Sequence, residues 1–464
     1  MAAVDALRAR GIDVRDAEAL ARGTALLVVD DGDEDGDAEL LVARTAAACR
    51  ALIAHVSGLP GGVRAVIATR AGQSVRTGER VRVAAAAAWG LGRTFQIEQP
   101  QRDLVLVDVD ADWDARRAAA ALIDELAITD RAGEDQVALR AGARLAPRLA
   151  AEIGGEVVPA GAPGLALRAD ATYLVTGAFG SLGRSVCSWL ADRGARRLVL
   201  VGCSVPPVAA GAGAAADVIR ALTRRGVDVE LVEGDVADGA LVGGLFARLA
   251  AGDRPLRGIF HLAGRLCEGP LDATREEELR YVLRGKVGGA WLLHRHGGEL
   301  PLDHFVVFGS IASWGGRHLG AYAAANEALH AIVALRAAAG LPAQCLSWGP
   351  WANSAMLSDQ TAAMLPAIGV EAIGHAQGLR CLEHALASRE RALTIGRFHW
   401  DVFAPYFEGG RTRGVLAVVP RARTTAAPAG AAALSERGCE LAAVDPAARR
   451  RELVALLAAR VGRV

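Results

Sequence analysis

Short apolar runs alternate with longer helical stretches along most of the chain, which is typical of parallel α/β sheets. In the first third, apolar runs and helical stretches follow each other over Ala25–Val29, residues 40–56, Val63–Ala68, residues 83–93 and Leu104–Val109. The loop after the first run, residues 30–37, consists of Asp, Glu and two glycines and would repel a phosphate. We therefore predict a truncated, structural α/β subdomain over residues 1–153.

A second series follows the segment 154–170, whose Gly and Pro content predicts a linker. Six apolar runs with helical stretches between them cover Tyr173–Val175, Leu198–Val201, Val227–Val232, Gly258–Leu262, Phe305–Phe308 and Gln344–Trp348. This pattern predicts a complete doubly wound parallel sheet over residues 171–408. The chain is thus expected to hold two Rossmann-like α/β subdomains, the first truncated and structural, the second complete. Residues 409–446 are expected to be a low-complexity linker, and residues 447–464 the start of a further helix.

Composition excludes several classes of protein. The 464 residues are 52% hydrophobic with a mean hydropathy of +0.24, which excludes global disorder. The 52 Lys and Arg residues balance 52 Asp and Glu residues, so no net basic field attracts nucleic acid or an anionic membrane. We expect neither as a partner.

The N-terminus and the cysteines favour a cytosolic protein. No stretch approaches the ~20 uncharged apolar residues of a membrane span, and the first residues lack the basic region of a signal peptide. The seven cysteines are scattered and form no CxxC pair, which argues against a disulfide framework and against a zinc site. We expect no metal.

A glycine-rich turn links the first strand of the second series to a helical stretch. Glycines in this strand-turn-helix context permit a tight turn and close approach of a pyrophosphate to the helix N-terminus. The candidate cofactor-binding residues are Thr176, Gly177, Phe179, Gly180, Ser181, Leu182 and Gly183.

Further candidates follow later strands. Asp235 and Val236 could bind an adenine, although an Asp at a strand end is also an ordinary feature of turns. Ala263 and Gly264 would allow backbone to approach a ribose. The preceding His261 is most simply interpreted as a core histidine, because nothing with metal-ligand spacing lies beside it.

The most specific group of residues surrounds Tyr322. Tyr322 and Asn326 share one face of a helical stretch, and Ser310 ends a strand where a doubly wound sheet meets its ligand. A tyrosine can act as a general acid, and a nearby cation helps its phenol to give up the proton. Lys286 is the one lysine among 52 basic residues. It is either a chance survivor at the surface or a site that needs a compact ammonium.

Together these motifs resemble the ketoreductase domain of a modular type I polyketide synthase, within the short-chain dehydrogenase/reductase superfamily. The resemblance covers nearly the whole chain, including Trp89-Gly-Leu-Gly-Arg93, Gly-Asp235-Val, Ala-Gly264, Lys286-Val-Gly-Gly-Ala, Phe-Gly-Ser310, Tyr322-Ala-Ala-Ala-Asn326 and Trp348-Gly-Pro-Trp351. Free-standing relatives usually carry Lys four residues after the Tyr. Here Asn326 holds that place and Lys286 lies upstream, an exchange characteristic of the megasynthase ketoreductases.

The resemblance implies a role for each of these residues. Tyr322 would protonate the ketone oxygen, Ser310 would hydrogen-bond to it, and Asn326 would organise the proton supply. Lys286 would activate the phenol, and Lys286 and Tyr322 would contact the cofactor, which is expected to be NADPH. The implied substrate is a β-ketoacyl chain on the phosphopantetheine of an acyl carrier protein, with neighbouring synthase domains as partners. Residues 447–464 would lead toward a following carrier domain.

Several positions depart from the family pattern. The strand ending at Val201 is usually followed by Ser-Arg, whose Arg grips the 2′-phosphate of NADPH, whereas Cys203 and Ser204 stand here. Ala178 replaces a glycine of the turn, and the loop from Ser310 to Tyr322 is one residue short. Two hypotheses follow. One is an active reductase with weak discrimination against NADH; the other is a reductively silent domain with a scaffold or epimerising role.

The resemblance also carries a stereochemical expectation. Trp314 lies eight residues before Tyr322, a position that accompanies formation of an L-configured hydroxyl by A-type members. Leu266-Cys-Glu268 replaces the Leu-Asp-Asp of the opposite class. Leu319 stands where epimerising relatives carry a His. Trp314 and Leu319 are therefore expected to orient the substrate, the alternative for Trp314 being a core tryptophan in a loop corner.

Overall fold

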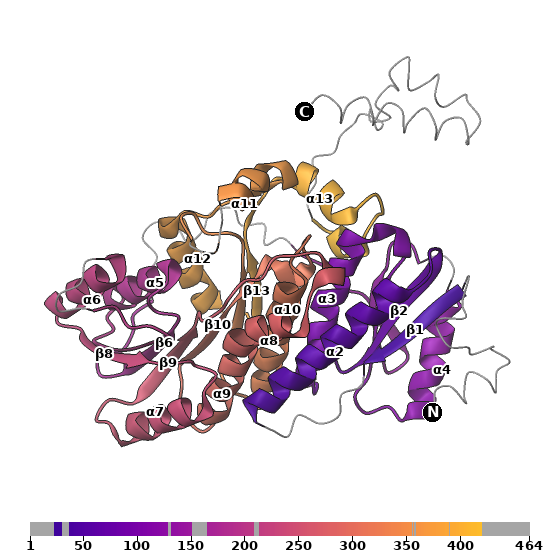
Figure 1. The fold of residues 1–464 in the computed structure, drawn as a ribbon. Coiled ribbons are helices and arrows are strands. Elements are labelled where there is room, and N and C mark those ends of the chain that lie inside the picture. The colour runs from indigo at the N-terminus through magenta and orange to yellow at the C-terminus, as the bar shows by residue number, and fades with distance from the viewer. Residues whose placement is uncertain are drawn as a thin grey trace, which may run out of the picture. The chain divides into compact units, whose positions relative to one another are not determined.

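The computed structural model describes residues 23–29, 37–128, 131–150, 165–207, 213–354, 356, 359–388 and 390–419. The described residues up to Val419 belong to one compact unit that holds a seven-stranded parallel sheet and a five-stranded mixed sheet (Figure 1). The acidic loop before Asp37, most of the predicted linker 154–170 and the helix predicted over 447–464 lie outside the described residues.

The first sheet has five strands in the order β1-β2-β3-β4-β5. Its elements are β1 (Gly23–Val29), α2 (Ala38–Gly58), β2 (Val63–Arg70), α3 (Val83–Glu98), β3 (Val105–Val109), α4 (Ala115–Leu126), β4 (Gln136–Arg140) and β5 (Ala143–Leu145). Strands β1 to β4 are parallel, and β5 returns antiparallel to β4. Sequence analysis missed α4, β4 and β5. Because the order never reverses, this sheet lacks the switch point at which doubly wound sheets bind ligands.

The second sheet has seven parallel strands in the order β13-β11-β10-β9-β6-β7-β8. They are β6 (Thr172–Thr176), β7 (Arg197–Gly202), β8 (Asp228–Glu233), β9 (Leu256–His261), β10 (His304–Ser310), β11 (Gln344–Trp348) and β13 (Ala392–Ile395). The order reverses between β6 and β9, so the ligand crevice of a doubly wound fold lies at their carboxyl ends. The predicted complete doubly wound sheet is confirmed, with β13 as an additional edge strand.

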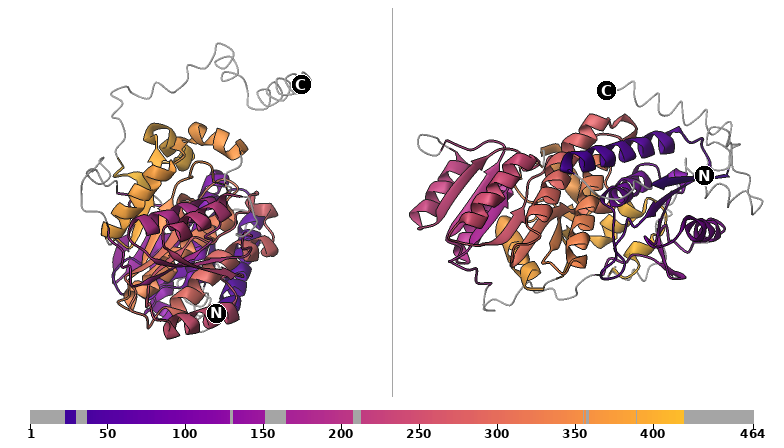
Figure 2. Two further views of the ribbon diagram at one scale, coloured as in Figure 1. Left: turned by 90° about the vertical axis from the view of Figure 1, so that its left-hand side faces the viewer. Right: turned by 90° about the horizontal axis from the view of Figure 1, so that it is seen from below.

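Helices cover both faces of this sheet (Figure 2). One face packs against α5 (Ser181–Asp192), α6 (Ala214–Arg224) and α12 (His375–Ser388). The other packs against α7 (Gly239–Ala251), α8 (Glu276–Leu283), α9 (Gly289–His296) and α10 (Gly320–Ala338). Successive strand residues such as Leu174 and Val175 enter opposite layers, as the alternation of side chains along a strand requires.

The segment after β11 extends the folded unit beyond the predicted boundary at residue 408. It contains α11 (Asp359–Met364), β12 (Val370–Glu371), β14 (Arg397–Phe398) and α13 (Trp400–Glu408). Buried Arg413 then donates to the Gln96 side chain at 2.7 Å and pairs with Asp135 at 2.9 Å. Residues 409–419 are therefore anchored to the first sheet's layer, and the predicted linker begins later than residue 409.

Helices α3 and α10 join the two sheets through a close contact (Figure 1). A methyl group at Gly90 would overlap the backbone oxygen of Ala323, so the helices meet backbone to backbone at this point. One turn further, Arg93 pairs with Glu327 of α10 at 2.8 Å, with both side chains almost buried. The first subdomain thereby holds the helix that carries Tyr322.

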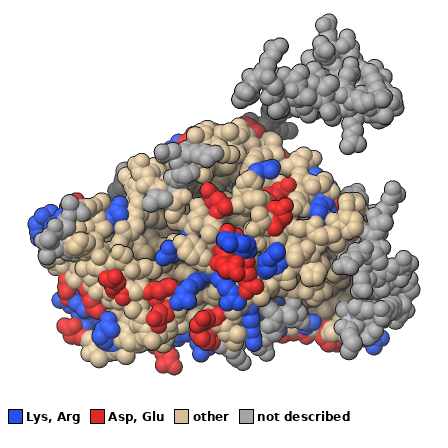
Figure 3. Space-filling view, in the orientation of Figure 1, with Lys and Arg blue, Asp and Glu red and all other residues tan. Residues whose placement is uncertain are grey.

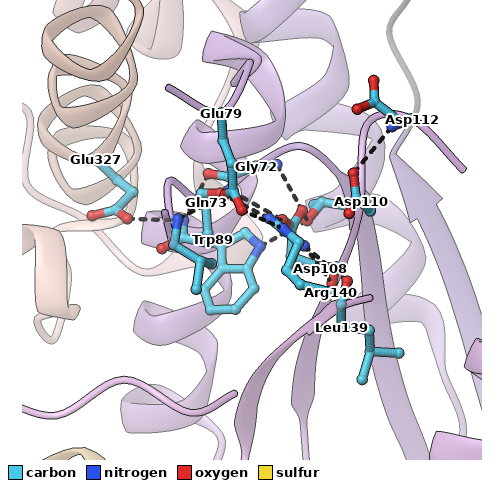
Figure 4. A network of polar contacts seen from close by, with 12 residues as sticks. Gly72, Gln73, Glu79, Trp89, Asp108, Asp110, Asp112, Leu139, Arg140 and Glu327 are labelled. Carbon is cyan, nitrogen blue, oxygen red and sulfur yellow. Dashed lines mark hydrogen bonds and ion pairs between the residues drawn. The ribbon is translucent and has the colours of Figure 1, made fainter. Parts of the chain in front are cut away.

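A polar network at the carboxyl end of β3 supports this contact (Figure 4). Fully buried Asp108 pairs with Arg140 at 2.6 Å and accepts the Gly72 backbone N–H at 2.6 Å. Burial raises the pKa of Asp108 even though Arg140 opposes the shift. Gln73 then donates to Glu327 at 3.0 Å. The edge where a nucleotide would bind is thus filled by the subdomain's own side chains.

Helix α2 is long and apolar enough to cross a membrane by length and composition alone. It carries Glu39, Arg44 and Arg50, and its apolar side chains pack against α3 and α8 in the core. On the face shown in Figure 3, acidic and basic side chains are interspersed. That face presents no continuous field of one sign.

We predict that Gly90→Ala lowers the free energy of unfolding by roughly 1–3 kcal/mol, because the added methyl group forces α3 away from α10. Gly244→Ala, inside α7, is the matched control because a methyl group there meets nothing within 4 Å. It should stabilise the protein by about 0.5–1 kcal/mol through helix propensity. Urea unfolding measures both changes, and equal effects at the two glycines would contradict the proposed backbone contact.

Candidate active site

The glycine-rich turn lies between β6 and α5, at the switch point of the second sheet. Gly177 has φ +66°, and a methyl group there would come within 2.8 Å of the Ala263 backbone nitrogen. A methyl group at Gly183 would overlap the Gly177 backbone oxygen. At exposed Gly180, by contrast, a methyl group would meet no protein atom closer than 3.4 Å. The turn therefore offers a cradle before the free N–H groups of α5, which fits a pyrophosphate.

The other residues of the turn lie mostly inside the fold. The Ala178 methyl group is buried in the core layer, so the departure from glycine adds no bulk to the cradle. The Phe179 ring lies against Gly202 at the end of β7, and Leu182 is half-buried in the same layer. The Ser181 hydroxyl donates to a backbone oxygen in the loop after β11 at 3.2 Å.

A chain of hydrogen bonds connects the turn to Lys286. The Ala263 N–H donates to the Thr176 hydroxyl at 3.3 Å, and this hydroxyl lies 2.7 Å from His261 Nδ1. His261 Nε2 lies 2.9 Å from the Lys286 backbone oxygen, which can only accept. Nε2 therefore carries the proton, and Thr176 donates to Nδ1. Burial lowers the pKa of His261 to about 4, which keeps the imidazole neutral.

This chain makes His261 a satisfied core histidine that positions other groups. It also changes the interpretation of Thr176. The Thr176 side chain is fully buried and committed to His261 and Ala263, so it supports the cradle from below and does not face a ligand.

Lys286 lies in a π-helical turn, Arg284–Gly288, between α8 and α9. Its side chain is 4% exposed, and Nζ donates to the Phe308 backbone oxygen at 2.9 Å. Nζ also lies 5.2 Å from the centre of the Tyr322 ring. A methyl group at Gly264 would come within 2.9 Å of Lys286 Cε, so the absence of a side chain there gives the lysine stem its path. The single lysine of the chain is thus a buried neighbour of Tyr322.

The remaining predicted catalytic residues gather at the same edge. Ser310 is the last residue of β10, half-buried, and its hydroxyl accepts the Ala312 N–H at 3.2 Å. Tyr322 lies half-buried in the first turn of α10. Fully buried Asn326 donates from Nδ2 to the Tyr322 backbone oxygen at 2.7 Å. Asn326 Oδ1 is buried and has no hydrogen-bond partner among the described residues. It is an acceptor still available beside Tyr322.

The predicted adenine residues follow β8. Asp235 accepts the Ala237 N–H at 2.9 Å and pairs with Arg284 at 2.8 Å. Partial burial raises the pKa of Asp235, but the hydrogen bonds from Arg284 and Ala237 outweigh it and hold the pKa below its usual value. The Val236 side chain is buried. A ligand would therefore share the Asp235 carboxylate with Arg284.

Trp314 and Leu319, the two residues expected to orient the substrate, lie in different surroundings. The Trp314 ring stacks on Phe398 at 5.8 Å between ring centres and meets Phe403 edge-on at 6.4 Å. It is thus one wall of an aromatic cluster with α13. Half-buried Leu319 begins α10 and bridges to Gly269. An aromatic cluster built from residues more than 80 positions downstream leaves no local sequence signal.

Glu98 is a functional neighbour that sequence analysis missed. Its carboxylate accepts the His318 N–H at 2.6 Å and the Leu271 N–H at 3.1 Å. The last residue of α3 therefore holds the two loops on either side of Leu319. Because these residues lie far apart in the sequence, only the fold reveals the contact.

A cavity of about 440 Å³ lies between the two sheets. Its lining includes Arg93, Glu327, His330 and Trp314, but none of the four predicted catalytic residues. Among the described residues, no group of three or more His, Cys, Asp or Glu side chains could hold a metal ion.

Comparison with known families agrees with this geometry. The model of the KR domain family matches residues 171–353. The model of the Rossmann fold domain of polyketide synthase extender module SpnB matches residues 2–149. Fold and site together define a short-chain reductase type of Rossmann domain joined to a smaller structural Rossmann-like subdomain.

Known relatives make the assignment more specific. Polyketide synthase GfsA of Streptomyces halstedii is 36% identical over 386 residues, which are 82% of this chain but 5% of that protein. The structure described as A-type ketoreductases from modular polyketide synthase has a TM-score of 0.71 at 33% identity, covering 82% of this chain and 77% of that one. A C2-type ketoreductase from a modular polyketide synthase has a TM-score of 0.69 at 27% identity, and the match covers 86% of this chain and 97% of that one. The chain belongs to the ketoreductase domains of modular polyketide synthases.

We predict that protonation of His261 destabilises the fold in acid. The unfolded chain takes up a proton near pH 6.5 and the folded protein only near pH 4, so stability is lost as the pH falls between these values. Between pH 7.5 and pH 5, protonation of His261 should lower the free energy of unfolding by about 2 kcal/mol. Urea unfolding of His261→Gln should show a correspondingly smaller loss. Exposed His55→Gln is the control and should keep the parental pH dependence.

Proposed function

We propose that this domain reduces the β-keto group of a carrier-bound acyl thioester to a β-hydroxyl group, with NADPH as the reductant. The observation that carries the proposal is the burial of the chain's single lysine against Tyr322, 5.2 Å from the ring centre, at the carboxyl edge of a doubly wound sheet. A scaffold has no need of a buried cation beside an accessible phenol, whereas a proton donor does.

Each side chain has a distinct role in the proposed reaction. Tyr322 donates its phenolic proton to the ketone oxygen as that oxygen gains charge, and Ser310 donates a second hydrogen bond to the same oxygen. Lys286, held by the Phe308 carbonyl, places a positive charge beside the Tyr322 ring. Asn326, through its free Oδ1, would accept a hydrogen bond from a water molecule that returns a proton to the phenol.

The cradle formed by Gly177, Gly180 and Gly183 would hold the pyrophosphate of the cofactor, and Ala263 and Gly264 would adjoin its ribose. Asp235 would accept from the adenine amino group beside Arg284. The bound nicotinamide supplies a hydride to the ketone carbon. Lys286 and Tyr322 would in addition contact the nicotinamide ribose.

The proposed partners follow from the domain's place in larger proteins. The chain spans 5% of GfsA and 23% of PikAIII of Streptomyces venezuelae, so neighbouring synthase domains are expected as partners. We infer that the substrate arrives on the phosphopantetheine arm of an acyl carrier protein. A cytoplasmic location stays a prediction.

For the stereochemistry we propose A-type behaviour with an L-configured hydroxyl. Trp314 and the Leu266-Cys-Glu268 segment favour it, as does similarity to an A-type structure at 33% identity. Stacking on Phe398 and an edge-on contact with Phe403 hold the Trp314 indole, which supports its proposed role as a fixed wall.

Tyr322→Phe is predicted to lower the rate of ketone reduction by ~10²- to 10⁴-fold, because only the transferable proton is removed. Binding of NADP⁺, measured by calorimetry, should stay within a few-fold of the parent. Tyr406→Phe, in the half-buried part of α13, is the control and should leave the rate unchanged. A Tyr322→Phe variant with near-parental turnover would remove the phenol from the mechanism.

Reduction of a short β-ketoacyl thioester should give predominantly the L-hydroxy product on chiral chromatography. Predominantly D product would refute the A-type proposal while leaving the reductase proposal intact. A protein that binds NADPH but yields no product from a carrier-bound substrate would instead support the silent-domain alternative, with a scaffold or epimerising role.

A further inference from the structure

The loop after β7 lacks the cation that recognition of a 2′-phosphate requires. In a Rossmann domain the adenosine ribose lies near the end of the second strand, where a carboxylate binds a 2′-hydroxyl or an Arg binds a 2′-phosphate. Here that strand ends at Gly202, and the sequence from Gly202 to Ile219 contains no Lys, Arg or His. The next cation, Arg220, pairs with Asp217 within α6. Exposed Cys203 and Ser204 provide no charge.

A cation reaches this position from another strand. Arg265 follows the Ala263-Gly264 loop after β9, and β7 and β9 are the two neighbours of β6, so their carboxyl ends share one edge. The Arg265 guanidinium donates to the Tyr281 hydroxyl at 2.8 Å and lies 4.9 Å from the centre of that ring. Its hydrogen bond with Tyr281 raises the pKa of Arg265, and the nearby Cys203 side chain contributes to the rise. The guanidinium is thus anchored to Tyr281 at the edge that the carboxyl ends of β7 and β9 share.

The charges around Arg265 leave it available to an anion. Arg284, the other guanidinium of this region, is committed to Asp235 at 2.8 Å. No carboxylate among the described residues lies within ion-pair distance of Arg265, although its charge contributes to the lowered pKa of Asp235. Arg265 is also exposed, so its remaining N–H donors face solvent. A guanidinium anchored on one side and free on the other is suited to bind a phosphate with two parallel hydrogen bonds.

We propose that Arg265 is the 2′-phosphate ligand of this ketoreductase, supplied by the loop after β9 in place of a cation in the loop after β7. The proposal rests on the proposed use of a nicotinamide dinucleotide and deepens it by assigning the residue that selects the phosphorylated form. Tyr281 is the positioning residue, because its hydroxyl and its ring hold the guanidinium.

The test compares binding of NADP⁺ and NAD⁺ to the folded protein by calorimetry. Arg265→Gln should weaken NADP⁺ binding by ~10- to 100-fold, the expected loss of a charge-assisted contact, and change NAD⁺ binding by less than a few-fold. Adenosine 2′,5′-bisphosphate and 5′-AMP should show the same contrast without the nicotinamide. Arg225→Gln is the matched control, because this exposed arginine pairs with Asp192 at the far ends of α5 and α6.

A second substitution shows whether the loss of NADP⁺ binding comes from the missing charge or from a disturbed fold. Cys203→Arg in the Arg265→Gln background returns a cation to the loop after β7 and should restore most of the NADP⁺ preference. If Arg265→Gln weakens the binding of NADP⁺ and NAD⁺ equally, or weakens neither, the assignment of Arg265 is overturned. The proposed function still stands in that case, provided that the wild-type protein binds NADP⁺. A wild-type protein that binds neither dinucleotide would instead overturn the proposed function itself.

Discussion

The contact between α3 and α10 is the constraint on which the arrangement of this domain depends. Tyr322 and Asn326 lie on α10, and their position relative to the second sheet is set where this helix meets α3. Backbone contact at Gly90 brings the helices close enough for Arg93 to reach Glu327. A buried ion pair contributes little net stability, but breaking it leaves an uncompensated charge. The pair therefore selects one register of α3 against α10.

The first subdomain has the form of a nucleotide-binding fold without the chemistry of one. Its strands run in sequential order, so no crevice opens at a reversal of strand order. The carboxyl end of β3 is occupied by Asp108, Arg140 and the Gln73 link to Glu327. The polar groups that could have bound a ligand instead connect the subdomain to the catalytic helix.

In the second subdomain, one set of hydrogen bonds connects the glycine-rich turn to Lys286. The Thr176 hydroxyl supports the glycine cradle through Ala263 and also fixes the tautomer of His261, which in turn holds the backbone of Lys286. A shift of the cradle is therefore passed on to the lysine beside Tyr322. Thr176 and His261, the middle members of this chain, are fully buried.

The sequence by itself determined the features that depend on local pattern. Alternating apolar runs located six of the seven strands of the catalytic sheet, because buried parallel strands are continuous apolar segments. The glycine spacing, the single lysine and the Tyr322–Asn326 interval indicated the site, because each depends on neighbouring residues. Short strands such as β5 and β13 were not predicted, because three or four residues are too few to show a periodic pattern.

Only the tertiary structure decided which distant side chains meet. Glu98 reaches Leu271 and His318, Trp314 stacks on Phe398, and Arg265 hydrogen-bonds to Tyr281. The partners in each case belong to different elements, and their approach follows from the order of strands in the sheet and from the packing of α3 on α10. Sequence spacing shows which groups a chain can offer. Which of these groups come into contact depends on which strands are neighbours. In a parallel sheet, the residues at one edge come from loops that are far apart in the chain.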